Sequence, residues 1–193
     1  HTWPEHYYHP EWLSDDLDER FQQMFYYALD NPTVDGPFPP DNDPNNIIPS
    51  GNGSLMFDRQ YFPEENLYKG AFFFIEPPYS VVGVGLDRYV LRGIYDMQGS
   101  EENEDGESAL RSLSMQVELG ECSVSDLSLE YRDPYFRLQN QQIPLLVEEK
   151  DGILFITADL DNVTTIMTDL GNDFTFRGVI TYQGEEYPFS SHI

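Results

Sequence analysis

Three histidines lie close together at the start of the chain: His1, His6 and His9. Imidazole nitrogens bind transition metals, and a histidine at the amino terminus can chelate copper through its amine and its ring together. A complete centre of this kind needs another histidine from elsewhere, and His192 is the only distant one in the sequence. Two hypotheses follow, a copper-binding protein with an N-terminal histidine or a surface segment without metal.

Oxygen-bearing side chains alternate in a second short segment, where Asp41, Asp43 and Asn45 form an Asp-x-Asp-x-Asn run. Calcium prefers such carboxylate and amide oxygens, and this spacing opens the calcium loop of an EF-hand. The rest of that pattern fails, because Asn46 stands where the sharp turn needs glycine and Asn52 stands where a bidentate Glu belongs. The run therefore predicts a weak calcium site at most.

A second acidic group falls near the ends of expected strands and consists of Asp159, Asp161, Asp169 and Asp173. These carboxylates would lie near one another if residues 160–168 and 173–182 form a hairpin. They are a second candidate for calcium binding. The alternative for both groups is that they are solvated turn residues without a ligand.

Catalytic motifs are missing from the sequence. It contains no G-x-S-x-G, no H-E-x-x-H and no P-loop. Adjacent carboxylates such as Glu148 and Glu149 are numerous, but neighbours on a strand point to opposite faces, so no pair is marked for glycoside hydrolysis. Cys122 is the single cysteine and has no histidine near it in the sequence, so we expect a buried thiol without a disulfide. The sequence therefore favours a protein that is not an enzyme.

The charge balance restricts the partners. The chain of 193 residues has 10 Lys and Arg against 35 Asp and Glu, a formal net charge of −25. This charge repels the phosphates of nucleic acids and anionic lipids, so neither is an expected ligand. It suits cations, a basic protein partner, or a halophilic-like surface adapted to salt. An acidic decoy that imitates nucleic acid towards a basic protein is an alternative function.

An amphipathic helix must come first among the elements. After Pro10 and Glu11, apolar residues recur every three or four positions, namely Leu13, Leu17, Phe21, Met24, Phe25 and Ala28. Asn31 and Pro32 end this pattern. Residues 31–53 are rich in Pro, Gly, Asn and Asp, which predicts an irregular connector.

Strand signals dominate from Ser54 onward. Apolar and polar residues alternate strictly in residues 113–119, 127–131 and 174–182, which is typical of antiparallel strands with one buried face. We expect further strands at 54–59, 67–75, 80–86, 88–97, 143–148, 153–159, 163–168 and 186–190. Turns are predicted at Asp151-Gly152, at 171–173 and at 183–185, and an exposed acidic loop at 99–107.

These elements predict a single domain over residues 1–193, with an N-terminal tail and helix (1–30), the connector (31–53) and a β body (54–193). The fold class is mainly β, an antiparallel sandwich or an up-and-down barrel-like sheet with one N-terminal helix. No apolar run approaches the length of a membrane span. The chain lacks an initiator Met, which suggests an extracytoplasmic protein that is secreted, periplasmic or anchored at the surface. The function we expect is a binding or structural module for an unidentified protein or small molecule.

Overall fold

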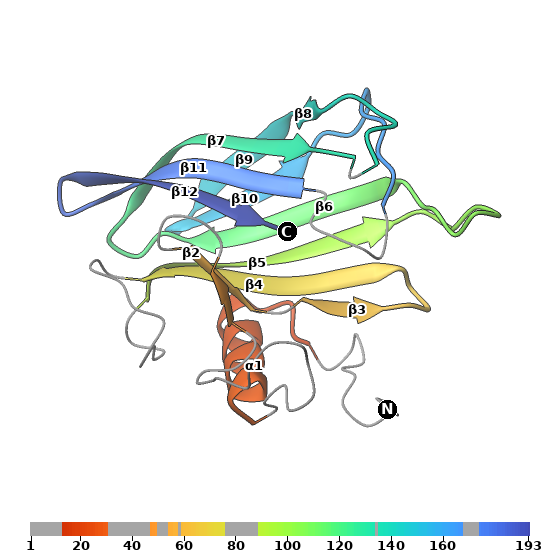
Figure 1. Cartoon of the computed structure of the whole chain (residues 1–193). Coiled ribbons are helices and arrows are strands. Elements are labelled where there is room, and N and C mark those ends of the chain that lie inside the picture. Colours follow the sequence, from red (N-terminus) through yellow and green to blue (C-terminus); the bar gives the residue numbers. More distant parts are fainter. Residues whose placement is uncertain are drawn as a thin grey trace.

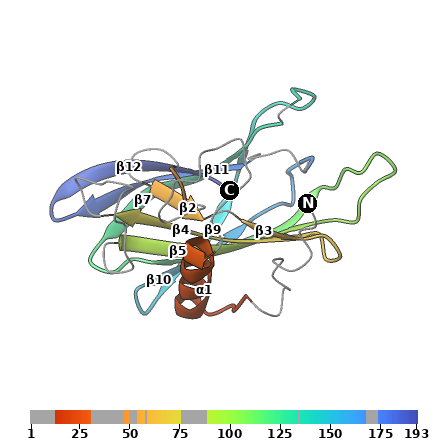
Figure 2. The ribbon, with the colours of Figure 1, turned by 60° about the horizontal axis from the view of Figure 1, so that its bottom comes forward.

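The architecture consists of two antiparallel sheets packed face to face, with one helix on the outer side of the larger sheet (Figures 1 and 2). The computed structural model describes residues 13–30, 47–49, 54–57, 59–75, 89–133, 135–167 and 174–193. The expected fold class, a mainly β chain with an N-terminal helix, is confirmed, and of its two alternatives the structure has the sandwich and not the barrel-like sheet.

The larger sheet has eight strands in the order β1-β2-β4-β5-β6-β10-β9, and β3 pairs with β4 beside β2. Its strands are β1 (Ile47–Pro49), β2 (Ser54–Phe57), β3 (Gln60–Phe62), β4 (Leu67–Ile75), β5 (Tyr89–Gly99), β6 (Leu110–Glu118), β9 (Leu145–Lys150) and β10 (Ile153–Ala158). The smaller sheet has the order β12-β11-β7-β8 and contains β7 (Ser123–Tyr131), β8 (Gln141–Ile143), β11 (Phe174–Tyr182) and β12 (Glu185–His192).

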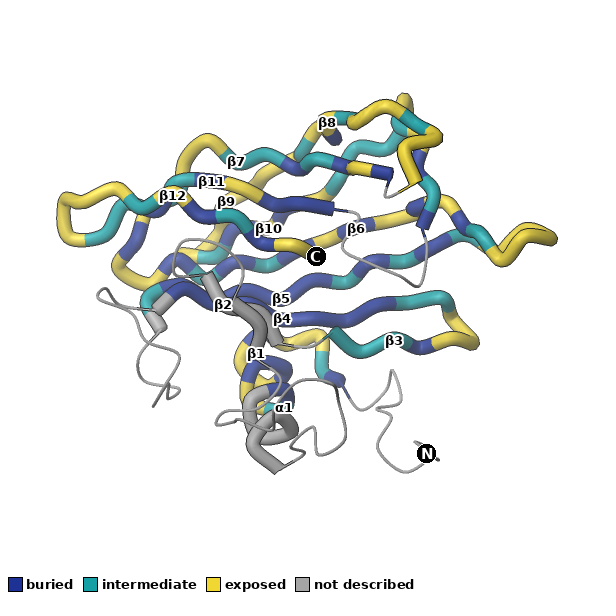
Figure 3. Tube along the Cα trace, in the orientation of Figure 1, coloured by how far each residue is buried: buried dark blue, intermediate teal, exposed yellow. Residues whose placement is uncertain are grey.

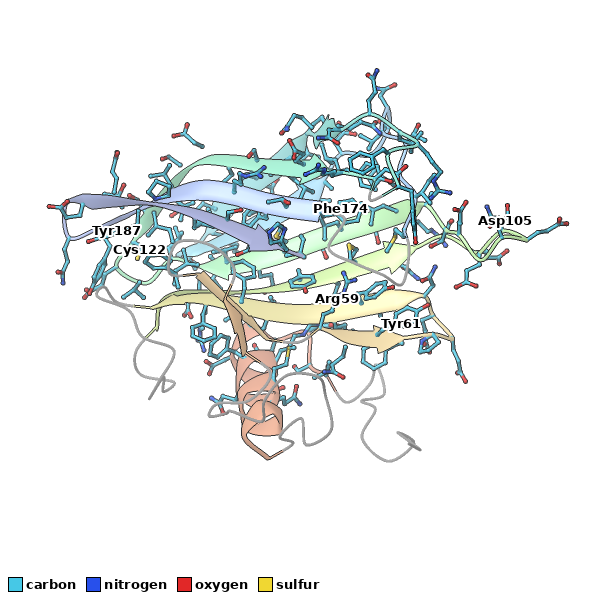
Figure 4. All side chains as sticks on the ribbon, viewed as in Figure 1. Arg59, Tyr61, Asp105, Cys122, Phe174 and Tyr187 are labelled. Carbon is cyan, nitrogen blue, oxygen red and sulfur yellow. The ribbon has the colours of Figure 1, made fainter. Side chains whose placement is uncertain are left out.

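The core lies between the two sheets, because the alternating apolar residues of both sheets face inward. The ring centroids of Phe72 on β4 and Phe176 on β11 are 6.0 Å apart, and those of Phe74 and Tyr187 are 5.9 Å apart. Cys122 belongs to this core, as expected, and burial together with the negative charge of Glu121 raises the pKa of its thiol. Figure 4 places Cys122 and Tyr187 at one end of the sandwich and Asp105 at the other.

Helix α1 (Leu17–Asp30) packs on the outer face of the larger sheet against β4 and β5 (Figure 2). The predicted start near Pro10 is wrong for the described part of this segment, because residues 13–16 are not helical. The side chain of Asp16 accepts a 3.0 Å hydrogen bond from the amide of Glu19 and thereby caps the helix at Leu17. Among the described residues, no helix combines the length and apolar character that crossing a bilayer requires.

Three buried cations lie where α1 meets the sheet. Arg20, Lys69 and Arg92 are only 1%, 6% and 7% exposed. Arg20 and Lys69 share the carboxylate of Asp15, at 3.0 and 3.1 Å, and Arg20 also binds Asp96. The hydrogen bond and charge of Lys69, assisted by Arg20, lower the pKa of Asp15. Ion pairs of Arg20 with Asp96 and of Arg92 with Asp18 therefore join the helix to the sheet.

The hairpin turns follow the predicted chemistry. Asp151 and Gly152 join β9 to β10 with φ of 54° and 78°, and Gln183 and Gly184 join β11 to β12 with φ of 51° and 79°. These paired left-handed conformations match the right-handed twist of the flanking strands. The turn predicted at 171–173 and the strand predicted at 80–86 lie outside the described residues.

Several strand predictions need correction. Residues 143–148 are not one strand, because Pro144 lies between β8 and β9, which belong to different sheets. β1 forms inside the connector predicted to be irregular, where Ile47 and Ile48 pair with β2, and the strand β3 was not predicted.

The segment 163–168, predicted as a strand, contains only an isolated bridge between Met167 and Ser108 within its described part. Its backbone groups bond instead to the side chains of Tyr131 on β7 and Gln141 on β8 and to the backbone carbonyl of Ser108. Residues 160–167 therefore do not form the first strand of the hairpin that was expected to bring the second acidic group, which includes Asp159 and Asp161, together.

Candidate functional site

One end of the sandwich carries three neighbouring connections: residues 100–109 between β5 and β6, residues 132–140 between β7 and β8, and residues 159–167 after β10. We call these three connections together the loop end. Residue 134 lies outside the described part of the chain. The three connections lie at the right of Figure 1, and Figure 3 shows that residues 100–109 and 132–140 are mostly exposed, whereas residues 159–167 are mostly intermediate or buried. Loops that a rigid sandwich holds together at one end are common positions for binding residues.

The 159–167 segment is tied to the β5–β6 connection. The amide of Leu110 donates a 2.7 Å hydrogen bond to the hydroxyl of Thr165. The amide of Met167 donates one of 2.7 Å to the carbonyl of Ser108. Thr165 and Met167 are both buried, so these bonds fix the segment against the body of the sandwich.

The same segment is tied to both ends of the β7–β8 loop. The Tyr131 hydroxyl accepts a 2.8 Å hydrogen bond from the amide of Ile166 and donates one of 3.1 Å to the same residue's carbonyl. The side-chain amide of Gln141 makes two bonds with the backbone of Thr164. The three connections therefore form one structural unit.

A buried carboxylate organises the β7–β8 loop. Asp133 is 1% exposed, and its two oxygens accept hydrogen bonds from the amides of Tyr135 (3.0 Å), Arg137 (2.7 Å) and Leu138 (3.0 Å). Burial alone would raise the pKa of Asp133, but these three donors and the charge of Arg137 outweigh it and lower the pKa. The ionised carboxylate therefore holds the loop in one shape.

We expect the substitution Asp133→Asn to loosen this loop without unfolding the sandwich. The neutral amide keeps one acceptor oxygen in place of two charged ones, so protection of the amides of Arg137 and Leu138 against hydrogen exchange should fall on the order of tenfold. Because the folded pKa is lowered, the wild-type bonds should be complete above the usual value of 3.8 and disappear as the pH falls through the lowered pKa. The exposed Asp161→Asn is the matched control, and equal protection in both variants would contradict the assignment.

The loop presents two aromatic side chains to solvent. Tyr135 is 51% exposed and Phe136 is 75% exposed, the highest value for a large apolar side chain in the described part of the chain. Phe136 also has a φ of 58°, which a bulky side chain rarely adopts. Among the residues whose burial is described, the other exposed large apolar side chains are Leu146, Val147 and Phe155, which lie along β9 and β10.

Two arginines flank the exposed rings. The guanidinium carbon of Arg132 lies 5.6 Å from the centroid of the Phe136 ring, and that of Arg137 lies 5.1 Å from the Tyr135 ring. Arg137 also bonds to Glu107 of the β5–β6 connection, and this bond raises the pKa of the guanidinium. Arg132 makes no ion pair with the described residues. The tip of the loop is therefore an aromatic and cationic spot on an acidic protein.

A polar hollow of about 290 Å³ opens at the same end of the molecule. It is lined by Gln141, Gln142, Pro144, Asp159, Asn162 and Val163. Gln142 donates from its side-chain nitrogen to Glu130 at 3.0 Å, whereas the side chain of Asn162 bonds to none of the described residues. The lining thus combines amide donors, amide acceptors and a carboxylate.

The predicted calcium residues are only partly placed. Asp159 lines this hollow, and its carboxylate accepts a 3.2 Å hydrogen bond from the backbone amide of Asp161, which is exposed. Asp169 and Asp173 lie outside the described residues, as do Asp41, Asp43 and Asn45. Within the described ranges, no group of three or more histidine, cysteine or acidic side chains is arranged to hold a metal. Calcium binding stays a prediction.

The predicted histidine site lies largely outside the described part of the chain. His1, His6 and His9 all belong to residues 1–12, which are not described. His192 is described on β12, where its Nδ1 atom lies 3.2 Å from the hydroxyl of Thr175. The copper hypothesis also stays a prediction.

The β7–β8 loop received no role from the sequence. The sequence holds two aromatics between two arginines here, in the run Arg132-Asp133-Pro-Tyr135-Phe136-Arg137, which lies between the strands predicted at 127–131 and 143–148. Aromatics usually point into the core, and only the fold shows that these two point outward. Comparison of the chain with protein-family models, with curated proteins and with solved structures finds no match.

Proposed function

We propose that the protein is a binding module without enzymatic activity, and that it binds its ligand with the β7–β8 loop at the loop end. Exposed Tyr and Arg side chains on a rigid support are the composition of binding hot spots. Asp133 supplies the rigidity, so the loop would lose little conformational freedom when it binds.

The conformation of Phe136 is the observation that carries the proposal. A bulky residue at a φ of 58° costs about 1–3 kcal/mol. Its ring is 75% exposed, so burial in the folded protein recovers little of that cost. Strain that the fold itself does not require is typical of functional positions.

The substitution Phe136→Gly tests this reasoning. Glycine adopts positive φ without strain, so the variant should be more stable than wild type by about 0.5–1 kcal/mol in urea unfolding. The control is Phe155→Gly, which removes a 39% exposed ring from strand β10 and should destabilise by about 1 kcal/mol or more. If Phe136→Gly destabilises as much as the control, the ring serves the fold and the proposal loses its support.

A further inference from the structure

Building on this proposed function, we infer that the ligand is a neutral carbohydrate chain, bound by the rings of Tyr135 and Phe136 and by the polar hollow beside β8. Exposed ring faces, hydrogen-bonding groups without a partner among the described residues, and the local charges of the loop end favour such a ligand.

The exposed rings suit the apolar faces of sugars. Tyr135 and Phe136 are 51% and 75% exposed, so a ligand can reach both. The C–H groups on one face of a pyranose ring are apolar and pack against aromatic faces, and the Tyr hydroxyl can hydrogen-bond beside them. Arg132, which has no ion pair within the described part of the chain, adds a fork of donors next to the rings.

The hollow suits hydroxyl groups. A sugar hydroxyl both donates and accepts, and a side-chain amide does the same. The amide of Asn162 and the oxygen of the Gln142 amide bond to none of the described residues, so both can bind a ligand. Asp159 adds a carboxylate, which accepts from hydroxyl donors.

The volume of the hollow limits what it can contain. At about 290 Å³ it is at the small end of the range for ligand pockets, enough for one small ring. A longer chain must continue outside it over the surface of the loop end. The exposed rings of the β7–β8 loop are part of that surface and provide the second contact.

Local charge selects a neutral ligand over charged ones. Residues 100–109 carry five carboxylates, namely Glu101, Glu102, Glu104, Asp105 and Glu107. These would repel nucleic acids, sulfated glycans and other polyanions. Arg137 is paired with Glu107 and Asp133, so its charge is compensated, whereas Arg132 has no ion pair with the described residues and would repel a cation beside the Phe136 ring. A neutral carbohydrate is repelled neither by the carboxylates nor by the arginine.

Native gel electrophoresis with embedded polysaccharides tests the inference directly. A protein of net charge −25 migrates quickly, so a decrease in its mobility caused by binding to a neutral polymer is easy to measure. The probes are soluble glucan, mannan, galactan and xylan, with polygalacturonate and chitosan as the charged comparisons. We expect at least one neutral polymer to retard the wild type, with about the same affinity at low and at high salt.

Matched variants locate the site. The double variant Tyr135→Ala/Phe136→Ala and the variant Asn162→Ala should each weaken retardation, the double variant by about tenfold or more. The control Leu146→Ala/Phe155→Ala removes exposed apolar side chains elsewhere and should bind like wild type.

The outcomes separate the inference from the proposed function. Retardation by a charged polymer alone, lost in Tyr135→Ala/Phe136→Ala, would overturn the neutral carbohydrate and keep the binding loop. Retardation by a neutral polymer that the double variant retains would overturn the loop as the binding site. If none of the probes retards the wild type, the carbohydrate inference is wrong, and the stability of Phe136→Gly still decides the proposed function.

Discussion

Replacing Arg20 by Met should destabilise the protein by about 2–4 kcal/mol, because the substitution removes the centre of a buried polar network. The Arg20 side chain is 1% exposed. Its Nε atom donates to the carbonyl of Ser14 at 2.7 Å, and one Nη atom donates to the carbonyl of Tyr95 at 3.2 Å. The remaining donors bind the carboxylates of Asp15 and Asp96.

Methionine preserves much of the volume of Arg20, so the loss should come from the hydrogen bonds and the charge. The side chain of Asp15 is exposed and that of Asp96 is half-buried, so both can be hydrated in the variant, which keeps the effect below that of a fully buried pair. Urea unfolding measures it, and Arg111→Met is the control because Arg111 is exposed and forms no ion pair with the described residues. Equal unfolding midpoints for the two variants would show that the network adds nothing to stability.

The substitution Gly70→Ala should destabilise by about 2–4 kcal/mol, through overpacking. A Cβ atom at residue 70 would lie 2.2 Å from the Cζ atom of the Tyr95 ring, and Tyr95 is only 1% exposed. Residues 70 and 95 are directly paired across β4 and β5, so neither backbone can move without distorting the ladder. Thermal unfolding measures the effect.

A second substitution tests the cause of this loss. In Gly70→Ala/Tyr95→Leu the ring is absent, so the double variant should be more stable than the sum of the single effects predicts, by about 1 kcal/mol or more. Additive effects would show that the alanine is unfavourable for a reason other than contact with Tyr95.

The fold could be predicted where local chemistry and burial agree. The alternation in residues 174–182 places Phe174, Phe176 and Ile180 in the core, as the structure confirms. The turn at Asp151-Gly152 depends on a conformation that glycine and aspartate adopt locally. Neither feature depends on which strand lies beside which.

Predictions based on composition alone were less successful. Residues 163–168 have the apolar and β-branched character of a strand, but their backbone bonds to Tyr131, Gln141 and Ser108 instead. Pro144 lies within a run with strand character and separates two strands that belong to different sheets. Such partners are far apart in the sequence, so propensity cannot identify them.

The sequence predicted calcium sites at carboxylates in turns and at strand ends. The proposed site depends on a different carboxylate, the buried Asp133. By itself, the sequence determined a mainly β chain with an amphipathic helix, a large negative charge and no catalytic motif. Only the tertiary structure decided that Asp133 is enclosed by three amides and that Tyr135 and Phe136 point outward on a fixed loop. The physical reason is that burial and hydrogen bonding depend on neighbours brought together from distant strands, whereas periodicity and turn chemistry act within a few residues.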